Sequence, residues 1–177
     1  MDPVKKIADF YDHYDRYIFN ITNPKKNYHN LNYFLYTDPD SVIVKSDGIE
    51  TKFGKHTINF QFSTDSPLFK IIRGIEEFCE RKIIQEHPIE FDGYTFKSAL
   101  YLGDNKSGKC LMYVKVPFRY DKCECEFVNK DGTHIQRDQI VKDSEINMQL
   151  KGSSVWIHRE SKQVGILWQV KHVYLLK

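Results

Sequence analysis

Residues 110–119, CLMYVKVPFR, constrain the fold more than any other part of the chain, because apolar and polar side chains alternate along them. In a β-strand, successive side chains point to opposite faces. The apolar face would belong to the core and consists of Cys110, Met112, Val114, Val116 and Phe118. The other face carries Tyr113, Lys115 and Arg119, an aromatic ring and two cations. We therefore predict a half-buried strand whose outer face is suited to binding rather than to catalysis.

Strand patterns recur through much of the sequence. The expected strands cover residues 31–37, 41–45, 57–62, 95–102, 110–119, 122–129, 145–159 and 164–176. The first two are expected to form a hairpin around Asp38-Pro39-Asp40, and 145–159 is expected to break near Gly152. Short connections with glycine at several bends predict a small closed barrel.

A single helix is expected between Ser66 and the residues before Pro88. Ser66 is a favourable N-cap, and Pro67 suits the first helical position. Apolar residues then recur at helical spacing, at Leu68, Ile71, Ile72, Ile75, Phe78, Cys79 and Ile83. This amphipathic stripe predicts that the helix packs on the sheet.

The length of the chain sets its domain organisation. A chain of 177 residues with 41% hydrophobic content can form one substantial core. Residues 1–30 are rich in Tyr, Asp, Asn and Lys and are expected to form an N-terminal arm. Residues 31–177 are expected to form a single β-rich domain, with the barrel core at about 90–177.

Charge and aromatic content say little about the partner by themselves. The chain has 26 basic and 24 acidic residues, so its net charge of +2 does not indicate a polyanionic partner. Residues 151–177 carry a net positive charge, because they contain five Lys and Arg residues and one acidic residue. Aromatic residues make up 14% of the chain, and tyrosine rings can remain half exposed on a binding surface.

The cysteines predict the compartment. Residues 1–10 lack the apolar core of a signal peptide, and the spacing of Cys79, Cys110, Cys123 and Cys125 is not that of a disulfide framework. We therefore expect an intracellular, reducing location. No apolar run approaches the ~18 residues that a membrane span requires, so no membrane association is expected.

Two motifs suggest cofactors but lack the required context. Gly103-Asp-Asn-Lys-Ser-Gly-Lys109-Cys110 nearly matches a phosphate-binding loop, yet a cysteine replaces the hydroxyl that ligates Mg²⁺ and a strand pattern follows. Cys123-x-Cys125 could supply two zinc ligands, but only Cys110 and His134 could complete the site, and their spacing is unfamiliar. We predict no metal and no other cofactor.

No catalytic constellation is visible. The seven histidines are scattered, and there is no G-x-S-x-G motif. The sequence therefore predicts that the chain is not an enzyme and has no small-molecule substrate.

The predicted outer face of the barrel combines aromatic rings with cations. Expected phosphate contacts are Lys97, Lys115, Arg119, Lys122, Arg159 and Lys171; expected stacking residues are Tyr101, Tyr113 and Trp156, with His158 beside them. Single-stranded nucleic acids need this combination, because every base offers a ring face and every nucleotide a phosphate. The same pattern also fits an ordinary half-exposed sheet, in which Tyr and Lys are favourable surface residues.

Three segments together resemble a known family. SSVWIHRE, VGILWQVKHVYLLK and LYLGDNKSGKCLMYVKVPF, with the lone helix, resemble the OB-fold single-stranded DNA-binding proteins of large DNA viruses and, more loosely, of phage. In that family a Trp-containing strand edge precedes G-[IL]-x-W-x-[VI], which residues 165–170 match. The resemblance covers residues 66–177. Phage members often end in an acidic tail, whereas this sequence ends in Leu175-Leu176-Lys177.

The resemblance and the patterns together predict an α+β, β-rich fold: an OB-like five-stranded barrel with one packed amphipathic helix and an N-terminal, strand-containing extension. The expected function is binding of single-stranded nucleic acid, with DNA as the expected ligand and RNA as the alternative, without strong sequence preference. The resemblance implies a role in viral replication or repair, in the host cytoplasm or nucleus. The alternative is a viral interaction protein that binds a protein partner, or a second copy of itself, through its Tyr-rich face.

Overall fold

The structure is a computed structural model that describes residues 28–36, 41–45, 50–52, 55–103 and 107–177. Its centre is a closed barrel of five strands. These strands are β2 (Val42–Val44), β4 (Lys55–Ser63), β7 (Lys109–Lys115), β11 (Glu145–His158) and β12 (Gln163–Leu175). β11 pairs with β2 and with β12, which closes the ring. The expected fold class is confirmed.

The strand order around the barrel is β2-β4-β7-β12-β11 and back to β2. Numbered along the chain, this is the order 1-2-3-5-4-1, in which the last two strands are exchanged. All pairs are antiparallel except β7 with β12, which is parallel. A five-stranded Greek-key barrel of this kind is the OB architecture.

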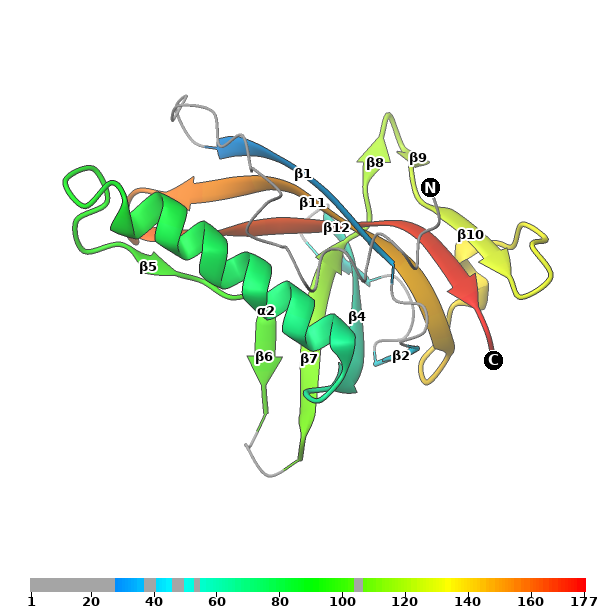
Figure 1. Ribbon diagram of the computed structural model, residues 1–177. Coiled ribbons are helices and arrows are strands. Elements are labelled where there is room, and N and C mark those ends of the chain that lie inside the picture. Colours follow the sequence, from blue (N-terminus) through cyan, green and yellow to red (C-terminus); the bar gives the residue numbers. More distant parts are fainter. Residues whose placement is uncertain (1–27, 37–40, 46–49, 53–54, 104–106) are drawn as a thin grey trace.

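Further strands extend the barrel at its margins. They are β1 (Tyr28–Tyr36), β3 (Glu50–Lys52), β5 (Thr95–Phe96), β6 (Leu100–Leu102) and β10 (Glu126–Asn129), together with the separate hairpin of β8 (Phe118–Arg119) and β9 (Lys122–Cys123). β1 pairs with β11 outside the barrel, as the expected N-terminal strand extension. Figure 1 shows the β8–β9 hairpin standing out from the body of the barrel.

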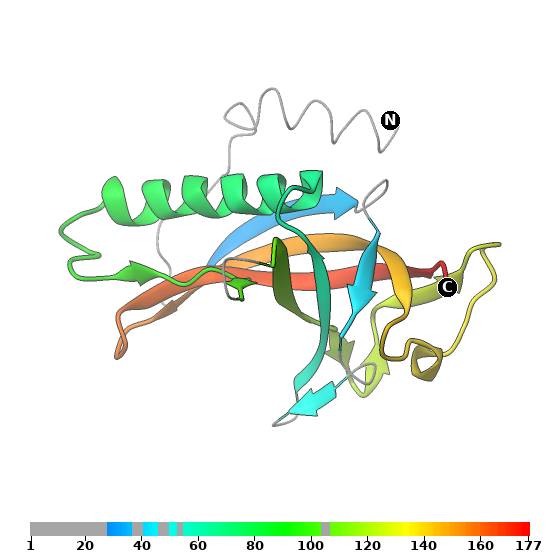
Figure 2. The same ribbon diagram turned by 90° about the horizontal axis from the view of Figure 1, so that it is seen from below.

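Helix α2 (Pro67–Glu80) lies across the barrel (Figure 2). The Ser66 hydroxyl accepts a hydrogen bond from the backbone N–H of Phe69 at 3.2 Å, as expected of an N-cap. The helix continues as one π-helical stretch, η2 (Arg81–Gln85), and ends before Pro88. A short 3₁₀ turn, η3 (Arg137–Gln139), precedes β11.

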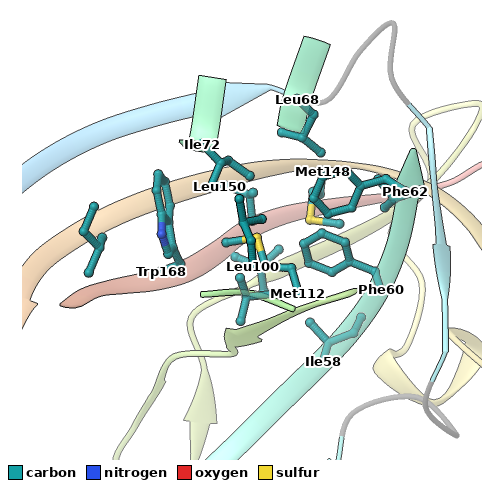
Figure 3. Close-up of a cluster of buried hydrophobic side chains, with 14 of the residues drawn as sticks. Ile58, Phe60, Phe62, Leu68, Ile72, Leu100, Met112, Met148, Leu150 and Trp168 are labelled. Carbon is teal, nitrogen blue, oxygen red and sulfur yellow. The ribbon is translucent and has the colours of Figure 1, made fainter. Parts of the chain in front are cut away.

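The core fills the barrel and the space under α2. Its fully buried side chains come from every barrel strand and from the helix, and Figure 3 labels Ile58, Phe60, Phe62, Leu68, Ile72, Leu100, Met112, Met148, Leu150 and Trp168 among them. The alternation predicted for residues 110–119 is confirmed along β7, where Cys110, Met112 and Val114 are buried and Tyr113 is exposed.

Several local expectations are wrong. The segments 31–37 and 41–45 do not form a hairpin, because β11 lies between β1 and β2 and pairs with both. Residues 95–102 form two strands, β5 and β6, separated by residues 97–99. β11 is continuous through Gly152, where only its register with β12 shifts. The barrel also includes β2 and β4, so it begins well before residue 90.

Candidate nucleic-acid interface

Tyr101 and Tyr113 form an exposed aromatic pair on the outer face of the barrel. Tyr113 lies on β7 opposite Asn59 of β4, and Tyr101 lies on β6, which pairs with β7. The two side chains are 46% and 44% exposed, in that order. Their ring centroids are 5.2 Å apart at an interplanar angle of 86°. Both rings therefore offer aromatic surface to a planar ligand.

Two lysines flank this pair. The Nζ of Lys97 lies 5.9 Å from the centroid of the Tyr101 ring. Lys115, at the end of β7, lies opposite Gln169 of β12 and Thr57 of β4. Among the described residues, neither lysine forms an ion pair with a carboxylate. Both cations can therefore contact phosphate groups next to a base stacked on the tyrosines.

Trp156 lies on the same face because of a glycine opposite it. Trp156 pairs with Gly165 across β11 and β12, and a Cβ atom on Gly165 would come within 2.6 Å of the Trp156 Cζ2 atom. The same Cβ would lie 2.7 Å from the backbone oxygen of Lys97. The indole therefore occupies the space left by Gly165, beside the segment that carries Lys97.

Three further cations lie beyond Lys115, around the β8–β9 hairpin. Arg119 and Lys122 pair across the β8–β9 hairpin, which follows β7 directly, and both are exposed. Lys171 follows Gln169 by two residues on β12. It precedes His172, which pairs with Glu126 of β10, so Lys171 lies close to the segment that follows the hairpin.

His158 and Arg159 lie at the tip of the β11–β12 hairpin and are exposed. The Nδ1 of His158 is 2.7 Å from the Ser161 hydroxyl oxygen, a contact that fixes the imidazole ring against the turn. This hairpin connects the fourth and fifth barrel strands. In OB folds, that loop and the face of the second and third strands, here β4 and β7, bind oligonucleotides.

The predicted residues therefore follow one another across the outer face of the barrel, and we call this series of side chains the path. Lys97, Tyr101, Tyr113, Lys115 and Trp156 form its middle, as the strand pairings above show. His158 and Arg159 lie at one end, and Arg119, Lys122 and Lys171 lie at the other. Along β12 the path runs from Gln163 to Lys171, a length of about 26 Å at the usual strand rise of about 3.3 Å per residue.

Glu76 supports this face from inside the protein. It lies on α2 and is only 3% exposed. Its carboxylate accepts hydrogen bonds from the Ser98 hydroxyl and from the backbone N–H of Ala99, the latter at 2.8 Å. Residues 97–99 connect β5 to β6, so Glu76 fixes the segment that carries Lys97 and leads to Tyr101.

Burial raises the pKa of the Glu76 carboxyl group above its ordinary value. The hydrogen bonds from Ser98 and Ala99 oppose this shift, as do the charge of Arg73 and the nearby Trp168 indole. Within the described part of the chain, the Trp168 Nε1 has no hydrogen-bond partner. Desolvation outweighs these partners, because a carboxylate inside an apolar core loses its hydration.

This pKa shift predicts a pH-dependent stability. The folded protein holds the Glu76 proton more tightly than the unfolded chain, where the pKa is near 4.5. Its stabilising contribution is therefore complete below that value and is lost as the pH rises through the raised pKa. Glu76→Gln cannot titrate, so the free energy of unfolding of the wild type should fall relative to that of the variant as the pH rises above about 4.5.

Urea denaturation across this pH range measures the difference. Glu77→Gln is the matched control, since it removes an exposed carboxylate from the same helix. The free energies of unfolding of Glu76→Gln and Glu77→Gln should diverge as the pH rises. A difference between wild type and Glu76→Gln that stays constant with pH would contradict the assignment.

The sequence did not lead us to two residues that position the outer face, Gly165 and Glu76. A feature of the sequence pointed to each of them. Gly165 interrupts an apolar strand pattern, which often marks a close approach of another group. Glu76 lies within the apolar stripe of α2, between Ile75 and Cys79, where a charged side chain is unexpected.

The two cofactor motifs lie mostly within the described residues. β7 begins at Lys109, so a strand and not a helix follows the loop 103–108, of which residues 104–106 lie outside the described part. Cys123 and Cys125 have no third or fourth ligand, since no group of three or more metal-binding side chains occurs in the described ranges. Burial raises the pKa of Cys79 to about 12 and that of Cys110 to about 11, so both are thiols at neutral pH.

Of the helices among the described residues, none has the length and apolar character that a membrane crossing requires.

The fold and this face define an OB-barrel protein with an aromatic and basic outer surface. No family model and no curated protein matches the sequence. The chain is similar in structure to gp2.5, a single-stranded DNA binding protein encoded by bacteriophage T7, with a TM-score of 0.58 and 10% identity over 82% of this chain and 87% of that one. It is also similar to the C-terminally truncated single-stranded DNA-binding protein of bacteriophage Enc34, with a TM-score of 0.52 and 11% identity over 88% and 93% of the two chains.

At this level of identity the similarity shows a shared fold. It confirms the OB barrel that the sequence predicted, and it covers a larger share of the chain than residues 66–177, the part covered by the family resemblance. It does not bear on the resemblance to proteins of large DNA viruses.

Proposed function

We propose that this chain binds single-stranded DNA, without strong sequence preference and without catalysis. The observation that carries the proposal is the path of the exposed Lys97, Tyr101 and Tyr113 with the half-buried Lys115 and Trp156 on the outer face of the barrel. It lies on the face that OB folds use for oligonucleotides. Alternating rings and cations suit a flexible single strand, because stacking and phosphate contact tolerate any base.

The structural neighbours support the same function. Both are phage proteins whose names describe single-stranded DNA binding, and both match most of this chain. A role in viral replication or repair follows from that assignment. A reducing intracellular location is consistent with the four cysteines, all of which are free.

A direct test is a gel shift with a labelled strand of ~20 nucleotides, as DNA, as RNA and as duplex DNA, at about 50 and 200 mM salt. We expect binding to the single strands that falls steeply with salt, because phosphate contacts release counterions. No binding at low salt would refute the proposal. The half-exposed Tyr101 and Tyr113 also suit a protein partner, and a salt-insensitive interaction with protein would favour that alternative.

Single substitutions on the path test which residues contact the strand. Tyr113→Ala and Trp156→Ala should each weaken binding by about 1–3 kcal/mol, the usual loss for one stacked base. Lys115→Ala should weaken binding equally for all sequences and lower the salt slope by about one unit. All three should remain folded, because their side chains point outward and leave no core cavity.

Fluorescence anisotropy titrations at several salt concentrations give both quantities. Lys142→Ala is the matched control, since it removes an exposed cation from the turn before β11, away from the path. Unchanged binding in all three path variants would place the site elsewhere.

A further inference from the structure

The β8–β9 hairpin has an unusual residue at its tip. The turn between Arg119 and Lys122 consists of Tyr120 and Asp121, whose φ angles are +48° and +62°. Positive φ at both central positions defines a type I′ turn, which favours Asn-Gly or Gly-Gly. A tyrosine at the first of these positions is held in a backbone conformation that bulky side chains disfavour.

Packing does not account for this tyrosine either. The Tyr120 side chain is 88% exposed, so it contributes almost nothing to the core. Backbone strain that is not compensated by burial is characteristic of functional positions. The side chain is therefore best explained by something that it contacts outside the protein.

The surroundings of Tyr120 indicate what that contact is. The guanidinium carbon of Arg119 lies 5.5 Å from the centroid of the Tyr120 ring, as in a cation–π pair. Lys122 adds a second cation across the turn, and the acidic side chains nearby in sequence are Asp121 in the turn and Glu124 two residues after Lys122. An exposed aromatic face next to two cations suits a base and its phosphates, as on the barrel face.

The base of the hairpin is firmly held, so its tip is a fixed platform. The Phe118 ring stacks on His56 with a centroid separation of 3.7 Å, and the guanidinium of Arg137 lies 5.5 Å from the Phe118 ring. The backbone N–H of Glu124 donates to the carbonyl of Pro117 at 2.8 Å. β8 begins three residues after Lys115, so the platform continues directly from the end of the path on β7.

We propose that Tyr120 stacks on an unpaired base and extends the nucleic-acid path from the outer face of the barrel onto the β8–β9 hairpin. The proposal rests on the single-strand binding proposed above and assigns it a further contact. Arg119 supports one face of the ring, and the base stacks on the exposed surface that remains. Arg119 and Lys122 then contact the phosphates on either side of that base.

Three substitutions at Tyr120 separate stacking from structure. Tyr120→Phe keeps the ring and should bind a 20-nucleotide oligothymidine within about twofold of the wild type, because stacking needs only the aromatic face. Tyr120→Leu and Tyr120→Gly should each weaken binding by about 5- to 150-fold, the equivalent of one lost stack. The salt slope should not change, since no phosphate contact is removed.

Tyr120→Gly also controls for folding. Glycine suits the positive φ of this position, so the melting temperature should equal or exceed that of the wild type while binding falls. Ile89→Ala is the matched surface control, because Ile89 is 93% exposed on the loop after η2 and should leave binding unchanged. Photo-crosslinking with oligothymidine that contains 5-iododeoxyuridine, followed by peptide mapping, should identify Tyr120 as a contact.

The outcomes distinguish the two proposals. In one outcome, the wild type binds and Tyr113→Ala weakens binding, while Tyr120→Leu and Tyr120→Gly bind as the wild type does. The hairpin is then not part of the path, and only the proposal for Tyr120 is overturned. Crosslinks confined to β7 would overturn it in the same way. If the wild type binds no single strand at about 50 mM salt, both proposals fail.

Discussion

Phe60→Ala should lower the free energy of unfolding by about 3–5 kcal/mol, the largest loss of stability expected from any substitution considered for this chain. Phe60 is 0% exposed and lies on β4 opposite Met112 of β7 and Val44 of β2. Its ring centroid is 5.7 Å from that of Phe62. A closed barrel cannot collapse around the missing ring, because each strand is fixed by two neighbours, so most of the cavity should remain.

Urea denaturation of the two proteins measures this loss. Gln61→Ala is the matched control, since Gln61 is the next residue of β4 and points to the outer face. The control should change stability by less than about 1 kcal/mol. A similar loss in both variants would show that β4 does not contribute its alternate side chains to the core as described.

Gly165→Ala should damage both stability and binding, and it is the second large effect we expect. The added Cβ would lie 2.6 Å from the Trp156 indole and 2.7 Å from the backbone oxygen of Lys97. That oxygen cannot move freely, because the N–H of Lys97 donates to the Val164 carbonyl at 2.7 Å. The indole must therefore leave its position, and we expect a loss of about 1–3 kcal/mol in unfolding free energy, as for other overpacked sites.

The same displacement should weaken single-strand binding, since Trp156 would no longer lie on the path. Gly74→Ala is the matched control, because no atom lies within 4 Å of a Cβ at that helical position. It should stabilise the protein by about 0.5–1 kcal/mol, the difference in helix propensity between the two residues. Gly165→Ala with wild-type stability and binding would refute the assigned contact between Gly165 and Trp156.

The outer face that carries the proposed binding path was largely predictable from local patterns. The alternation in residues 110–119 assigned Tyr113 and Lys115 to the outer side of β7, and the same reasoning assigned Trp156 to the outer side of β11. In both strands the structure agrees, with Val114 and Val155 buried. The grouping of these residues on one path depended on strand pairing, which no local pattern specifies.

Strand pairing was also predicted wrongly from the sequence. Two adjacent strand patterns around Asp38-Pro39-Asp40 are typical of a hairpin, yet β11 separates β1 from β2 in the sheet. A turn signal shows where the chain can reverse. It does not show that the flanking strands pair, because a strand more than a hundred residues away can compete for the same edge.

By itself the sequence determined the N-cap of α2 and the inward and outward sides of β7, β11 and β12, because these follow from backbone periodicity and from the few nearest residues. Only the tertiary structure decided the closure of the barrel by β11 and β12, the place of Trp156 over Gly165, and the contact of Glu76 with Ser98, which is 22 residues away. These features join distant segments. Their free energy depends on which surfaces the whole chain brings together, and that information is absent from any single stretch of sequence.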